Sequence, residues 1–171
     1  MLHRAFAIMS VFALGLGAGA CVAPTVSLTG KTADIAEYAS SAPGLGVNTA
    51  EVLASVNAYR RSYGLQPVRI DAAVTRAARA QSAAMAQQGV LSHDAGGDFR
   101  ARLLANGVGR APAVENIAWG TRTFAETMQI WIASYSHAQN MQTPDMTRVG
   151  VALVNGSNGP YWTMVMAGNA R

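Results

Sequence analysis

Residues 149–167 have the sequence Val-Gly-Val-Ala-Leu-Val, Asn-Gly-Ser-Asn-Gly-Pro, Tyr-Trp-Thr-Met-Val-Met-Ala, and this stretch decides the fold. The two apolar runs, 149–154 and 161–167, predict antiparallel strands joined by a hairpin with a longer loop. Side chains alternate between faces along a strand, and here both faces are apolar. Such a sheet must be covered on both sides. We therefore expect an α+β fold, an α-β-α sandwich with a small antiparallel sheet flanked by helices.

The covering helices are predicted from capping residues and helical spacing. Asn48 followed three residues later by Glu51 has the spacing of a capping box, and Gly64 stops the helix that begins there. A second helix begins after Asp71 and ends at Gly89, and its alanines allow close packing. A short helix is expected over 99–105 and a third strand over 114–119. Another helix, capped at residue 123, runs to about residue 133.

Composition narrows the class of protein. The chain has 171 residues, of which 50% are hydrophobic and 13% are charged, which is typical of one globular domain. The formal net charge is +4, and it falls to +3 without Arg4, because 12 Lys and Arg then oppose 9 Asp and Glu. The arginines are scattered, and no basic stripe is interleaved with aromatic residues. We therefore expect no nucleic-acid partner.

The N-terminus has the pattern of an export signal. Arg4 precedes an apolar run over 5–16, and Ala18-Gly19-Ala20 forms a small-residue cleavage site. The apolar run is too short to span a membrane. Residues 1–20 are therefore predicted to be a signal peptide.

Cys21 is the single cysteine and directly follows the cleavage site, as in the lipobox of bacterial lipoproteins. Ala18 stands where such motifs usually have Leu, so ordinary signal cleavage that leaves a free thiol is the alternative to lipidation. Residues 21–47 are expected to be a linker after an acylated Cys21, and residues 48–171 the folded domain. With Val22 next, we expect an exported lipoprotein of the outer membrane or cell surface, with a periplasmic or secreted protein as the alternative.

Several motifs occur in an order that resembles the CAP superfamily, in its short bacterial branch of SCP or pathogenesis-related-1-like domains. The resemblance covers about residues 48–168. It rests on Ser92-His93-Asp94, Phe99-Arg100-Ala101-Arg102-Leu103, Glu115-Asn116-Ile117-Ala118-Trp119-Gly120, the Trp131, Ser134 and His137 spacing, and Arg148-Val149-Gly150-Val151-Ala152. It implies the same α-β-α sandwich.

The resemblance also implies a binding cleft. His93 and His137 match its two histidines, and Glu115 is expected to accept a hydrogen bond from one of them or to orient a metal-bound water. Asn116 would tie down a neighbouring loop. Ser134 stands where many members have a second glutamate, so a mechanism that needs two carboxylates is in doubt.

Each of these residues also has a plainer interpretation. His93 would be an ordinary loop residue, Glu115 a solvent-facing residue at a sheet edge, and His137 a surface residue in a loop rich in Ser, Tyr and Gln. Glu126 is better explained as the partner of Thr123 at a helix start than as the missing glutamate. A serine nucleophile is not indicated, because no Gly-x-Ser-x-Gly elbow is present.

The apolar aromatic and sulfur-containing side chains favour core packing. Trp119, Trp131 and Trp162 each lie on an apolar face of a predicted element. The alternation of Met164 and Met166 indicates strand packing, with a Met-lined groove for an acyl chain or sterol as the second interpretation.

Two main hypotheses for function follow. The first is a non-catalytic binding module of the cell envelope, tethered to the membrane by lipid on Cys21, whose ligand is a lipid, sterol, glycan or envelope protein. The second is a metal-assisted hydrolase of peptidase or nuclease type, in which His93 and His137 hold Zn²⁺ or another divalent ion and Glu115 is the candidate catalytic base. An adhesin or envelope spacer with an incidental cleft is a third option.

Overall fold

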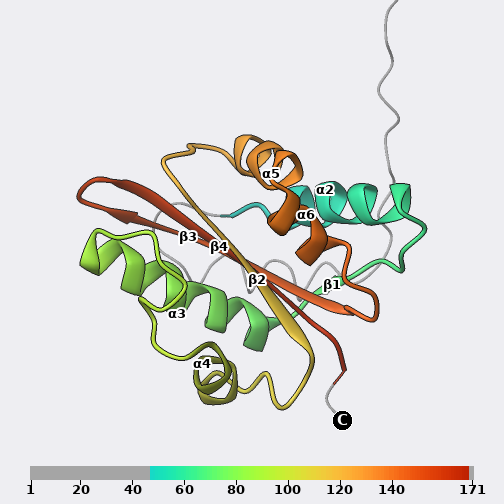
Figure 1. Ribbon diagram of the computed structural model, residues 1–171, viewed down its shortest axis with the longest axis horizontal. Coiled ribbons are helices and arrows are strands. Elements are labelled where there is room, and N and C mark those ends of the chain that lie inside the picture. The colour runs from blue at the N-terminus through green and yellow to red at the C-terminus, as the bar shows by residue number, and fades with distance from the viewer. Residues whose placement is uncertain (1–46, 170–171) are drawn as a thin grey trace, which may run out of the picture.

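The computed structural model describes residues 47–169, and Figure 1 shows a sheet between two layers of helices. The α+β sandwich predicted from the sequence is confirmed. The predicted signal peptide, Cys21 and most of the predicted linker lie outside the described residues, and so do residues 170–171.

The sheet has four strands in the order β1-β3-β4-β2, with β1 over Arg69–Ile70, β2 over Ala113–Trp119, β3 over Arg148–Gly156 and β4 over Gly159–Ala167. The pairs β3–β4 and β2–β4 are antiparallel, as expected. The two-residue strand β1, which the sequence did not indicate, pairs in parallel with β3 and makes the sheet mixed. So short a strand has no periodicity of its own.

The hairpin between β3 and β4 is tighter than predicted. Gly156 pairs with Gly159, so only Ser157 and Asn158 connect the strands, and the expectation of a longer loop was wrong. Gly159 has φ of 132°, which an L side chain rarely adopts. The Asn158 amide donates to the carbonyl of Gly89 at 3.1 Å, so the turn is tied to the helix beneath it.

Helices cover both faces of the sheet. In Figure 1, α2 (Thr49–Ser62), α5 (Phe124–Ala133) and α6 (Tyr135–Met141) lie on one side, whereas α3 (Ala72–Gln88) and α4 (Phe99–Ala105) lie on the other. The side chains of Asn48 and Asp71 cap α2 and α3, and Gly89 ends α3 in the left-handed conformation, as predicted. Helix α6 was not predicted.

The two faces of β3 and β4 bury different sets of side chains. Val149, Val151, Met164 and Met166 pack under α2, α5 and α6, which confirms the packing role expected for the two methionines. On the opposite face, Ala152, Val165 and Ala167 pack against α3 and α4. The alternation seen in the sequence therefore separates one core layer from the other.

Gly150 allows α3 to lie very close to the sheet. A Cβ atom at this position would lie 2.3 Å from the backbone nitrogen of Thr75. No side chain fits in that space.

The edge strand β2 accepts hydrogen bonds from side chains of α5 and α6. The Trp131 indole of α5 donates to the carbonyl of Ile117 at 3.1 Å, and the Asn140 amide of α6 donates to the carbonyl of Glu115 at 3.0 Å. These bonds fix the position of α5 and α6 relative to Glu115.

Two of the three tryptophans are core residues, and the third is not. Trp131 and Trp162 are buried, as predicted, but Trp119 is 48% exposed. It lies at the end of β2 beside the hairpin, with its ring 6.4 Å from that of Tyr161. The prediction that Trp119 is a core residue was wrong. The alternation along a strand predicts which face of the sheet a side chain lies on, but it does not predict how far the helices extend over that face.

A buried arginine links α2 to the chain after α6. Arg60 is 1% exposed, and within residues 47–169 it forms no ion pair. Instead its guanidinium donates to the carbonyls of Gln66, Met141, Thr143 and Met146 at 2.8 to 3.4 Å. Burial lowers its pKa.

None of the helices among the described residues is long and apolar enough to cross a bilayer.

Candidate functional site

Glu115 is the centre of the candidate site. Strand β2 holds it at 7% exposure, so the solvent-facing alternative was wrong. Its Oε1 lies 2.9 Å from Nδ1 of His93, and its Oε2 accepts from Nη2 of Arg102 at 2.5 Å. A buried carboxylate needs such partners to remain charged. The sequence-predicted contact between a histidine and this glutamate is thus present.

No role was predicted for Arg102, although it lies in one of the motifs that resemble the family. Helix α4 directs it inward, with the side chain 3% exposed, and its Nη1 also donates to the carbonyl of Gly97 at 3.0 Å. The guanidinium carbon lies 5.4 Å from the centre of the Phe99 ring. The sequence carried no signal of this burial, because the partners of Arg102 lie on other elements.

The loop that carries His93 is held by a buried glutamine. Gln81 of α3 is fully buried, and its Nε2 donates to the carbonyls of Ser92 at 2.6 Å and His93 at 3.2 Å. Its Oε1 accepts from the backbone N–H of Gly96 at 3.0 Å. A Cβ at Gly96 would lie 2.5 Å from this oxygen, so the loop needs glycine there. Gln81 therefore positions His93 without touching its ring.

His93 combines an exposed ring with a fixed hydrogen bond. Its side chain is 56% exposed, so a ligand can reach it. The hydrogen bond to Glu115 raises the pKa of His93, and this effect exceeds the opposing effect of burial. The protonated ring is thus favoured over the neutral one relative to an isolated histidine.

His137 lies on helix α6 rather than in the loop that was the plainer alternative. Its carbonyl accepts from the Asn116 side chain at 3.0 Å, and Asn140 donates both to Asn116 Oδ1 at 2.8 Å and to the backbone of Glu115. The expected structural role of Asn116 agrees with these bonds. Two asparagines therefore connect the backbone of His137 to that of Glu115.

The environment of the His137 ring is unlike that of His93. Its Nδ1 is buried and has no hydrogen-bond partner among the described residues. Burial lowers the pKa of His137, and the charge of His93 lowers it further. The two histidines thus affect each other electrostatically, and they favour opposite protonation states.

Two further residues from the sequence analysis have local roles. Ser134 ends α5 and begins α6, and its hydroxyl lies 3.4 Å from that of Ser136. Within the described part of the chain it has no hydrogen bond to His93, Glu115 or His137. Glu126 completes the capping box with Thr123, as predicted, and two backbone N–H bonds lower its pKa.

The side chains present do not fit a zinc site. Zinc in proteins usually takes three or four protein ligands. Both oxygens of Glu115 are engaged, one of them by a guanidinium, and residues 47–169 contain no group of three His, Cys, Asp or Glu that could hold a metal ion. Two imidazoles remain as donors.

The fold and site together define an α-β-α domain whose edge strand presents a glutamate bonded to a loop histidine and a helix arginine. The chain belongs to the CAP family, also called the cysteine-rich secretory protein family, whose model matches residues 53–166.

One curated relative is the uncharacterized protein YkwD of Bacillus subtilis, which is 31% identical over 148 residues. The match covers 84% of this chain and 56% of the relative, so the chain spans little more than half of that protein.

Solved structures share the fold. An extracellular protein containing an SCP domain from Bacillus anthracis has a TM-score of 0.63 at 24% identity, over 71% of this chain and 40% of the other. An outer surface protein from Borrelia burgdorferi also has a TM-score of 0.63, at 15% identity, over 74% of this chain and 98% of the other.

Proposed function

We propose that this chain is an exported, non-catalytic binding module of the cell envelope whose ligand site is formed by His93, Glu115, His137 and Ser134, with Glu115 acting through the His93 ring that it holds. The observation that carries the proposal is the double engagement of Glu115, which lies between Arg102 and His93. Both oxygens of Glu115 are already engaged in hydrogen bonds, so neither is free to take a proton from a bound water or ligand. The site is therefore better suited to binding a ligand in a fixed geometry than to general-base catalysis.

The exposed His93 ring requires a hydrogen-bond acceptor on the ligand, which each of the proposed ligand classes can supply. With Nδ1 bonded to Glu115, the ring's other nitrogen is the one left to donate to a ligand oxygen. Of the ligand classes that family resemblance implies, glycans and lipid head groups supply such oxygens. A sterol hydroxyl or a protein carbonyl would supply one as well.

A binding experiment with the mature chain tests the proposal. We expect wild-type protein to be retained by an envelope extract, and His93→Gln, Glu115→Gln and His137→Gln to reduce retention separately. Arg79→Gln serves as the control, because Arg79 is an exposed residue of α3. If all three site variants are retained as well as wild type, the proposed binding role is wrong.

Export and lipid anchoring through Cys21 form the second part of the proposal. The residue pattern over 1–21 supports it, and two proteins of similar fold are described as extracellular or as an outer surface protein. We expect Cys21→Ser to move the protein from the membrane fraction to the soluble fraction. Equal membrane association of both forms would argue against lipidation, leaving signal cleavage with a free thiol.

One observation still bears on the metal-assisted alternative, although the side chains described above do not make up a zinc site. His137 has an unpartnered buried nitrogen and a lowered pKa, and a neutral imidazole is the form that binds metals. Zinc measured by elemental analysis in wild type and in His93→Ala/His137→Ala separates the two hypotheses. Stoichiometric zinc in wild type alone, together with chelator-sensitive hydrolysis, would replace the binding proposal.

A further inference from the structure

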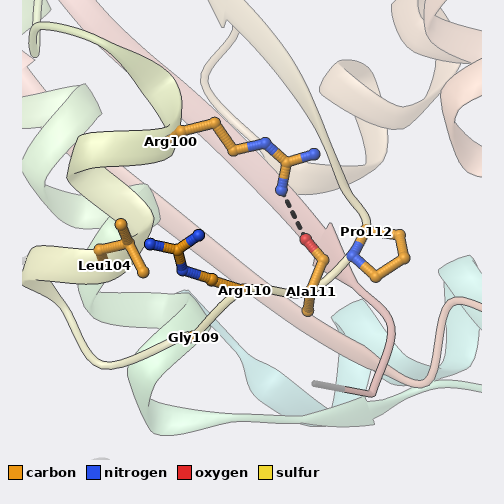
Figure 2. A pocket seen from close by; sticks show the side chains of 6 residues that line it. All are labelled: Arg100, Leu104, Gly109, Arg110, Ala111 and Pro112. Atoms are coloured by element: carbon orange, nitrogen blue, oxygen red, sulfur yellow. Dashed lines mark hydrogen bonds between the residues drawn. The ribbon is translucent and has the colours of Figure 1, made fainter. Parts of the chain in front are cut away.

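A concave surface lies between helix α4 and the segment that leads into β2. Figure 2 shows its lining residues, and the cavity has a volume of about 560 Å³. This size is within the range of small-molecule sites in proteins. The residues that line it are Arg100, Leu104, Gly109, Arg110, Ala111 and Pro112.

The groove combines apolar walls with two cations. Leu104 is 49% exposed, and Pro112 lies across from it (Figure 2). Neither Arg100 nor Arg110 forms an ion pair within residues 47–169. The nearby carboxylate of Asp98 accepts from the backbone N–H of Ala101 as the cap of α4. Among the described residues, no carboxylate therefore lies within ion-pair distance of either guanidinium.

The walls of the groove are held by hydrogen bonds before any ligand arrives. Arg100 Nη1 donates to the carbonyl of Ala111 at 2.5 Å, the dashed line in Figure 2. The carbonyl of Pro112 accepts from Gly168 at 2.8 Å, and that of Val108 accepts from Arg148 at 3.3 Å. Ala111 and Val108 are both 2% exposed. A preformed wall loses little conformational entropy on binding.

The groove is separate from the Glu115 site, although one helix serves both. Arg102 of α4 is buried against Glu115, whereas Arg100 and Leu104, two positions before and after it, line the groove. Residues two apart on a helix do not share a face. Binding in the groove therefore does not require His93 or His137.

We propose that this groove binds a small amphipathic anion, with an oxyanion group between the guanidiniums of Arg100 and Arg110 and a compact apolar body against Leu104 and Pro112. Guanidinium groups bind carboxylate and phosphate oxygens through paired N–H donors. The apolar walls require a ligand that also has carbon surface to bury. This inference does not depend on the proposed function of the Glu115 site.

Amide chemical shifts of the mature protein, titrated with phenyl phosphate and with phenylacetate, test this inference. We expect saturable shifts confined to residues 99–113, and none with benzyl alcohol, which has the ring without the charge. Arg110→Gln should weaken binding by about tenfold or more, because a charge-assisted bond is lost. Arg110 has no hydrogen bond or ion pair in the described structure, so its replacement leaves the fold intact; Arg79→Gln is the matched control.

Each contrary result is decisive. If no probe gives saturable shifts in this segment, or if Arg110→Gln and Arg79→Gln behave alike, the groove is not an anion site. If inorganic phosphate binds as tightly as phenyl phosphate, the apolar walls contribute nothing and the amphipathic assignment is wrong. Stronger binding of one organic anion over the other identifies the oxyanion group.

Discussion

Arg102 and Glu115 form an ion pair at 2.5 Å in which both side chains are at least 96% buried, and the pair joins helix α4 to the outer strand β2. Taking one partner away leaves an unpaired charge in the interior. We expect Arg102→Met to lower the free energy of unfolding by about 3–5 kcal/mol, as measured by urea denaturation.

Arg79→Met is the control for that measurement, since Arg79 is exposed on α3, and its effect should stay within about 0.5 kcal/mol. If the double variant Arg102→Met/Glu115→Leu is no more stable than Arg102→Met alone, the loss does not come from the isolated carboxylate.

The two histidines give opposite dependences of stability on pH. The pKa of His93 is raised in the folded state, so its contribution is fully present below its unfolded value of about 6.5 and is lost as pH rises through the folded pKa. The pKa of His137 is lowered, so stability is lost as pH falls from about 6.5 toward the folded pKa. Glu115, Arg102 and Asp94 are the charged groups acting on His93.

This pH dependence is tested with two variants followed between about pH 5 and 8. In His137→Gln, where only the His93 effect remains at the site, stability should rise on acidification relative to wild type. In His93→Gln it should fall. Parallel curves for the two variants would contradict the opposite shifts.

Gln81 is expected to control the protonation of His93 through the loop. Replacing it with Met removes three hydrogen bonds to residues 92–96 and loosens the contact with Glu115. NMR titration should then show the pKa of His93 falling toward about 6.5, with faster exchange of the Gly96 amide. Gln87→Met, on the exposed side of the same helix, should leave both unchanged; equal effects of the two variants would mean that Gln81 merely stabilises α3.

Arg60 and Arg61 form a natural pair for a stability test, because one is buried and its neighbour is exposed. Arg60→Met leaves four carbonyls without their donor and should cost about 3 kcal/mol or more. Arg61→Met should cost less than about 0.5 kcal/mol. Thermal or chemical unfolding of the two variants measures the difference, and similar losses would contradict the role given to the buried guanidinium.

The elements with local signals were predictable, and those created by distant contacts were not. Asn48, Asp71 and Gly89 mark helix ends by their own conformational preferences, so those boundaries agree with the structure. Strand β1 exists only because Arg69 and Ile70 pair with β3, nearly 80 positions later. Helix α6 has only seven residues, and Ser134, the residue before it, caps both α5 and α6.

The candidate site divides in the same way. The contact of His93 with Glu115 followed from family motifs, since nothing in the local sequence brings residues 22 positions apart together. Arg102 and Gln81 were missed because a buried polar side chain is recognised by its partners, and partners on other elements are not visible in composition.

An exposed edge strand can pair with a strand of another polypeptide, and such pairing leads to aggregation. In this domain the Trp131 and Asn140 side chains already occupy carbonyls of β2, and the opposite outer strand is only two residues long. A protein that is concentrated at a surface would gain from this arrangement, because neighbouring copies find no continuous backbone to extend. The groups that fix Glu115 in place thereby also obstruct strand addition along this edge of the sheet.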